Sequence, residues 1–229
     1  KGPAALLYGS DAIGGVINLY SDIPPAKPFE GKTELFMRSV NESLGLSVRV
    51  AGKNNWFYYK ANLTLVDYAD YKVPTDSIQY YSYYIRLKEQ RLRNTAGKER
   101  DGSLLCGYAG ERFSTSFRIS DTYVRSGFFA NAHGLEVRLS DIDYDRSRCD
   151  IDLPRHDVNH LKVTNHSAWR TGAVRWESNL SYQNNLRREH SEPVSHGYMP
   201  MPPGTLERKY IKNTYTASLG MKALIAERH

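Results

Sequence analysis

The sequence lacks long apolar segments. No run approaches the roughly 20 consecutive apolar residues that a membrane-spanning helix requires, and the mean hydropathy is −0.58. These two observations exclude a helical membrane protein. They do not exclude a membrane β-barrel, because its strands alternate between apolar and polar residues and are polar on average.

Cysteine and catalytic motifs are also scarce. Cys106 and Cys149 are the only cysteines, and they form neither a metal-binding pair nor a disulfide framework. The sequence has no nucleophile elbow, no phosphate-binding loop and no zinc-protease pair. We therefore expect no enzyme, no catalytic residue, no metal site and no cofactor.

Positive charge is in excess but is not concentrated. The formal net charge is +6, and Lys and Arg are scattered through the chain instead of being gathered in one tract or helix. Nucleic-acid binding is therefore not expected. A basic surface or channel that attracts an anionic solute fits this distribution.

From Thr33 onward, apolar and polar residues alternate in repeated segments. In residues 44–51, for example, Leu and Val occupy the even positions, and Gly, Ser, Arg or Ala the odd ones. A period of two predicts strands with one apolar and one polar face. The segments are about as long as the 9–11 residues that cross a bilayer at a tilt. The expected strands are 33–41, 44–53, 56–69, 98–109, 113–125, 157–169, 174–187 and 209–222.

The expected connections alternate in length. Short turns fall at 52–55, 110–112 and 170–172, and long connections at about 70–97, 126–156 and 189–208; the link at 41–43 is short where a long one is due. Long loops on one side and short turns on the other are typical of outer-membrane barrels. The 17 tyrosines suit the aromatic girdles of such barrels, and they also suit a Tyr-rich soluble β protein. Residues 77–93 fit neither period, and we place them in the first long loop, as a strand rising above a membrane or a short helix.

The first stretch carries the most specific pattern. Residues 2–18 read GPAALLYGSDAIGGVIN, which locally predicts a short helix, a tight turn and a strand, as in many α/β proteins. As a string, it closely resembles the end of the plug domain of TonB-dependent outer-membrane receptors, with Lys1 where that family usually has Arg. We therefore expect the C-terminal end of a plug domain at 1–22, a proline-rich linker at 23–32 and the N-terminal part of an outer-membrane β-barrel at 33–229.

The resemblance implies a fold and a function. The fold is an antiparallel transmembrane barrel of 22 strands, of which the eight expected here are the first third, so we expect a fragment of a longer protein. The function is energy-coupled uptake of a scarce solute across the cell outer membrane: a ferric siderophore first, then cobalamin or haem. The implied partners are outer-membrane lipid, the solute, and the TonB complex of the inner membrane, reached through a missing N-terminal segment.

Two other classes stay open. A small outer-membrane binding or adhesin barrel would pair its first and last strands. A soluble β-rich enzyme or binding module would bury both Tyr59 and Lys60 inside a two-sheet core.

Three groups of residues are functional candidates. The resemblance makes the glycine-rich turn a hinge or latch between plug and barrel, and the alternation predicts polar side chains that face a lumen. The last long loop combines His, Met and Tyr between prolines, which suits a stiff mouth that touches a ligand. The candidates are Gly9, Ser10, Asp11, Gly14 and Gly15 for the hinge; Arg49, Lys60, Arg118 and Arg175 for the lumen; and His190, His196, Tyr198, Met199 and Met201 for the loop.

Overall fold

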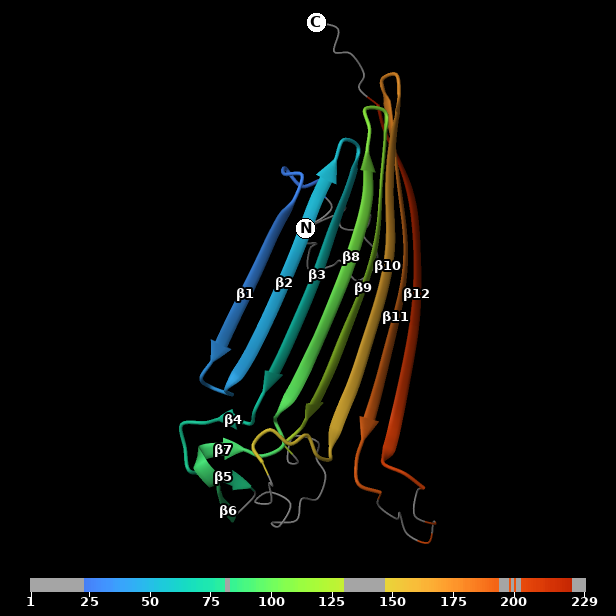
Figure 1. The fold of residues 1–229 in the computed structure, drawn as a ribbon. Coiled ribbons are helices and arrows are strands. Elements are labelled where there is room, and N and C mark those ends of the chain that lie inside the picture. The colour runs from blue at the N-terminus through green and yellow to red at the C-terminus, as the bar shows by residue number, and fades with distance from the viewer. Residues whose placement is uncertain are drawn as a thin grey trace, which may run out of the picture.

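The computed structural model describes residues 23–80, 83–129, 147–193, 198, 200 and 203–223. Its main element is one antiparallel sheet of eight strands (Figure 1), so the chain is mainly β, as predicted. No α-helix occurs in the described ranges. In order across the sheet the strands are β1 (Glu30–Arg38), β2 (Ser43–Asn54), β3 (Phe57–Tyr68), β8 (Gly97–Ala109), β9 (Phe113–Gly127), β10 (Arg155–Thr171), β11 (Val174–His190) and β12 (Leu206–Ala223).

Each predicted strand is present, and most differ from the prediction by one to three residues at an end. The first strand begins at Glu30, so the last three residues of the predicted linker belong to the sheet. The predicted plug end, residues 1–22, lies outside the described residues.

The sheet is open. β1 pairs only with β2, and β12 pairs only with β11, so the first and last strands of the described sheet are not neighbours. The pairing that a small closed barrel of eight strands requires is therefore not formed. The other two sheets have two strands each, and no second large sheet covers the first within the described ranges. The two-sheet core of a soluble sandwich is likewise not seen there.

The connections gather by length at the two ends of the strands, as Figure 1 shows. We call these the loop end and the turn end. Residues 39–42 and the described parts of the three long connections lie at the loop end, whereas the turns after β2, β8 and β10 lie at the turn end. Asn55 and Gly172 adopt φ of 51° and 60°, the left-handed conformation that tight hairpin turns require.

The first long connection holds small elements of its own. They are β4 (Tyr71–Lys72), β5 (Ser77–Tyr80), β6 (Tyr83–Arg86), the 3₁₀ turn η3 (Lys88–Gln90) and β7 (Arg91–Leu92). β5 pairs with β6 and β4 pairs with β7. Residues 77–93 therefore form a small hairpin and one 3₁₀ turn within the loop, and not one continuous strand or an α-helix. None of the helical segments in the described ranges is long and apolar enough to cross a membrane.

The large sheet has two unlike faces. Directly opposite residues of paired strands share a face, and so do residues i and i+2 of one strand. By this register, one face carries large apolar side chains from all strands except β10 that are 40% to 81% exposed, and we call it the apolar face. They are Leu35, Met37, Leu44, Phe57, Leu63, Leu104, Phe113, Phe117, Ile119, Leu180, Ile211, Tyr215, Leu219 and Met221.

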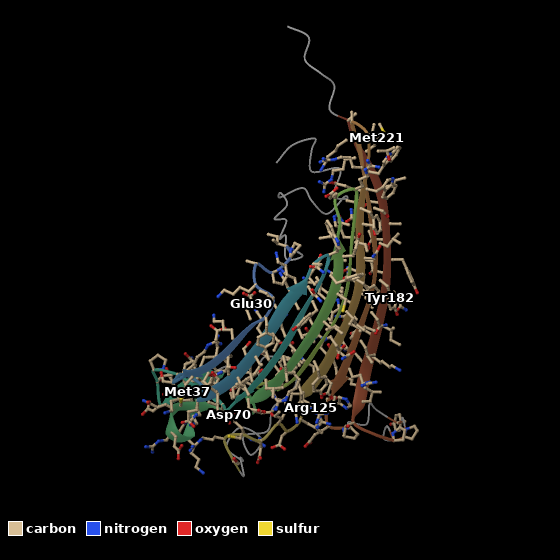
Figure 2. The ribbon with its side chains drawn as sticks, turned by 45° about the horizontal axis from the view of Figure 1, so that its top comes forward. Glu30, Met37, Asp70, Arg125, Tyr182 and Met221 are labelled. Atoms are coloured by element: carbon tan, nitrogen blue, oxygen red, sulfur yellow. The ribbon has the colours of Figure 1, made fainter. Side chains whose placement is uncertain are left out.

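Aromatic rings cluster at the turn end of the apolar face. The Trp169 and Trp176 rings stack with centroids 6.2 Å apart and an interplanar angle of 13°. Tyr108 contacts both Phe57 and Phe113, with centroids 5.2 and 6.1 Å apart. Met221 lies at this same end, whereas Asp70 and Arg125 lie at the loop end (Figure 2).

Candidate functional site

The opposite, polar face carries a basic centre. Two adjacent rows of directly opposite residues cross it from β2 to β12, and their only charged side chains are Arg49, Lys60, Arg118 and Lys162. We call these four residues the basic stripe. No carboxylate lies in either row from β2 to β12, so this part of the face is positively charged. The other members of the rows are Ala51, Asn62, Ser103, Leu105, Ser120, Thr164, Gln183, Ser181, Thr214 and Thr216.

Cross-strand hydrogen bonds orient the polar side chains between these cations. Arg49 Nε donates to Asn62 Oδ1 at 2.9 Å, and Asn62 Nδ2 donates to Ser103 Oγ at 3.0 Å. On the far strands, the hydroxyls of Ser181 and Thr216 are 2.7 Å apart. Amide and hydroxyl groups held beside cations form a surface that suits an anionic, oxygen-rich solute or a complementary protein segment.

The structure separates Arg175 from the other three predicted lumen residues. Arg175 lies on the polar face, but at its turn end, directly opposite Arg170 and Lys222. Its Nε is 3.0 Å from Glu177 Oε1, and Lys222 Nζ is 3.0 Å from Glu177 Oε2. Its charge is partly neutralised, and it does not belong to the basic stripe.

Only two of the predicted loop residues lie in the described ranges. His190 ends β11 on the apolar face, where its Nε2 is 3.5 Å from Asp157 Oδ2 and its Nδ1 is 3.2 Å from Thr205 Oγ1. The structure therefore does not bring His190 to the basic stripe. The side chain of Tyr198 is fully exposed. The remaining loop and hinge candidates lie outside the described residues: His196, Met199, Met201, Gly9, Ser10, Asp11, Gly14 and Gly15.

A polar network at the loop end was not anticipated from the sequence. Asp70, which is 1% exposed, accepts hydrogen bonds at Oδ1 from the backbone N–H groups of Thr95 and Ala96, at 2.7 and 2.9 Å. The guanidinium of Arg91, also buried, donates to the backbone carbonyl of Asp70 at 3.0 Å. These bonds close the two ends of the first long connection onto each other.

Glu42, in the short link between β1 and β2, adds charge to this network. Its carboxylate contacts the Arg91 guanidinium, lies 2.8 Å from Arg148 Nε and lies 3.7 Å from Lys72 Nζ. The hydrogen bond from Arg91 is the largest effect that lowers the pKa of Glu42, and the charges of Arg91, Arg148 and Lys72 lower it further.

Asn94 extends the network to the second long connection. Its Nδ2 donates to the backbone carbonyls of Phe128 and Pro154, at 3.0 and 2.9 Å, and its Oδ1 accepts from the N–H of Asp152 at 2.8 Å. No period or motif marks these residues, because each bonds to a partner tens of residues away. The network gives the loops beside the sheet a fixed base.

Side chains that ligate metals are not grouped in the described ranges. No group of three or more His, Cys, Asp or Glu side chains there has a geometry that could hold a metal ion. Cys106 and Cys149 are free thiols, and both are exposed.

A comparison of the chain with models of known protein families found no match, and no curated protein matches its sequence.

Proposed function

We propose that this chain is part of a TonB-dependent outer-membrane receptor that takes up a scarce solute. A ferric siderophore is the first candidate, followed by cobalamin or haem. The observation that carries the proposal is the contrast between the two faces of one long meander, with its long connections at one end. The assignment to this receptor family rests on the pattern of residues 2–18.

The apolar face supports a membrane location. Monomeric soluble proteins rarely expose contiguous apolar patches larger than a few hundred Å², whereas here Leu, Ile, Phe or Met side chains stand exposed on seven of the eight strands, with β10 the exception. The strands are 9 to 18 residues long, and roughly 9–11 residues cross a bilayer at a tilt. Stacked aromatic rings at the turn end match the girdle that such proteins place at a membrane interface.

The polar face supports a solute path. The basic stripe lies on the face that would line a barrel lumen, and its cations attract a solute that carries carboxylate or phosphate groups. The unpaired edges of β1 and β12 in the described sheet are compatible with further strands, as a barrel of 22 strands requires. An open edge in a bilayer is not stable, because its backbone groups have no water to bond.

Adjacent residues of β11 provide the test of membrane insertion. Leu180 is on the apolar face and is 51% exposed, whereas Ser181 is on the polar face. Leu180→Arg places a charge in lipid, at a cost of about 2–4 kcal/mol near the bilayer centre, and we expect it to reduce the folded fraction in outer membranes. Ser181→Arg is the matched control and leaves that fraction unchanged. Equal effects of the two variants, or a soluble monomeric wild-type chain, would contradict the proposal.

Solute binding has a separate test. Ferric siderophores, cobalamin and haem are titrated into the protein in detergent, and the fluorescence of its tryptophans is followed. Arg49→Gln with Lys60→Gln is expected to weaken binding of an anionic ligand, because two cations of the basic stripe are lost, while a neutral ligand binds as before. Equal affinity of this variant and the wild type for an anionic ligand would show that the basic stripe does not contribute to binding.

A further inference from the structure

A row of charged residues crosses the apolar face at the loop end. Each member is directly opposite the next, on β3, β8, β9, β10, β11 and β12 in turn, and we call this set the charged row. Toward the turn end the same face becomes apolar, at Leu63, Ile119 and Leu180. The charged row consists of Asp67, Lys98, Arg125, Asp157, Arg188 and Lys209.

The two carboxylates of the row are already paired. Asp67 accepts hydrogen bonds at both oxygens from Arg100 Nη2, at 2.8 and 2.7 Å. Asp157 has a side chain that is 8% exposed, contacts the Arg125 guanidinium and accepts a hydrogen bond from the hydroxyl of Tyr123 at 3.0 Å. Neither acid is left to neutralise the other cations of the row.

Three cations of the row form no ion pair in the described part of the chain: Lys98, Arg188 and Lys209. Lys98 also lies directly opposite Asp67, and Arg188 directly opposite Asp157, but both carboxylates are paired with other cations. Arg188 lies directly opposite Lys209, and Lys98 lies directly opposite Arg125. Like charges directly opposite each other across a strand pair are destabilising. An anion from outside the protein that bridges each pair would remove this repulsion.

We propose that the charged row binds the phosphate groups of anionic lipid headgroups in the leaflet at the loop end. The inference rests on the proposed function, since the apolar face must lie in a bilayer. On β3, β8, β9 and β11 the row lies closer to the loop end than the exposed large apolar side chains of the same strands, and so nearer the headgroups, where basic residues attract anionic lipid. The guanidinium of Arg188 matches a phosphate with two parallel hydrogen bonds, and Lys209 adds a point charge. An open row across six strands suits several headgroups in a leaflet better than one enclosed free phosphate.

The experiment compares two double variants that each remove two positive charges. Arg188→Gln with Lys209→Gln removes two cations of the charged row. Lys53→Gln with Lys212→Gln removes two cations of the polar face, to which those lysines belong. The full chain in neutral detergent is given phosphatidylglycerol or phosphatidylcholine, and native mass spectrometry counts the lipids retained. We expect the wild type and the polar-face variant to prefer phosphatidylglycerol. The row variant should bind it roughly 30-fold more weakly, the loss that two basic residues near an anionic surface predict.

The same substitutions, made in the whole receptor to which we assign the chain, are also inserted into vesicles of phosphatidylcholine alone, which separates the two proposals. Insertion without a preference for phosphatidylglycerol, or equal losses in both double variants, would overturn the lipid site and leave the membrane location intact. Displacement of the lipid by excess inorganic phosphate would show a site for free phosphate and would also overturn it. Failure of the wild type to insert into any vesicle would overturn both proposals.

Discussion

Removal of the Asp70 carboxylate should open the first long connection. In Asp70→Ala the N–H groups of Thr95 and Ala96 lose their acceptor, and Ala96 is fully buried. A donor left without a partner at a buried site costs about 1–3 kcal/mol, so the loss of both hydrogen bonds predicts at most about 2–6 kcal/mol in the free energy of local opening. The strands of the large sheet keep their own ladders, so this loss should be confined to the loop end.

Hydrogen exchange measured by mass spectrometry on peptides that cover residues 88–97 tests this reasoning. At the lower bound, the amides of Thr95 and Ala96 should exchange roughly 30-fold faster in Asp70→Ala than in the wild type, and peptides from β11 should not change. Asp70→Asn is the matched control, because it removes the charge but keeps an acceptor oxygen, and we expect a smaller effect. Unchanged exchange at Thr95 and Ala96 in Asp70→Ala would refute the role given to this carboxylate.

Two further predictions concern charge and packing. The pKa of Glu42 is lowered in the fold, so its ionised form stabilises the loop end above the ordinary pKa, and this stability is lost as pH falls through the lowered value. The melting temperature of Glu42→Gln should therefore lack this dependence on pH. A side chain at Gly107 would meet the Tyr58 ring at 2.1 Å, so Gly107→Val should cost about 1–3 kcal/mol in urea unfolding. Gly102→Val, with open space around it, should cost clearly less.

The alternation of apolar and polar residues predicted the eight strands, because it reflects the different surroundings of the two faces and is present in the sequence of each strand by itself. For the same reason, the alternation did not predict where the strands end. β11 continues to His190, beyond the predicted end at 187, because Arg188 and Glu189 place polar groups on both faces while the backbone ladder continues. The alternation in the sequence ends where the apolar face ends, whereas the backbone hydrogen bonds of the strand continue beyond it.

The partners of Asp70 and the charged row were beyond sequence reasoning. Asp70 bonds to residues 25 and 26 positions away, and this closure depends on the register that sets Tyr68 opposite Gly97. The charged row likewise can be recognised only when five strand registers are known, because a shift of one residue on any strand moves its side chain to the other face. Arg49, Lys60 and Arg118 were predictable as members of the polar face, but their position beside each other was not.

The order of the strands has a consequence for how the chain folds. β2–β3, β8–β9 and β10–β11 are joined by tight turns, so each pair forms by a local hairpin closure with a small entropy cost. Neighbouring hairpins are joined to each other only by the two longest connections, which link β3 to β8 and β9 to β10. Asn94 belongs to the first connection and bonds the backbone of the second at Phe128, Asp152 and Pro154. The two slow closures are therefore coupled, and the hairpins should join together cooperatively instead of one at a time.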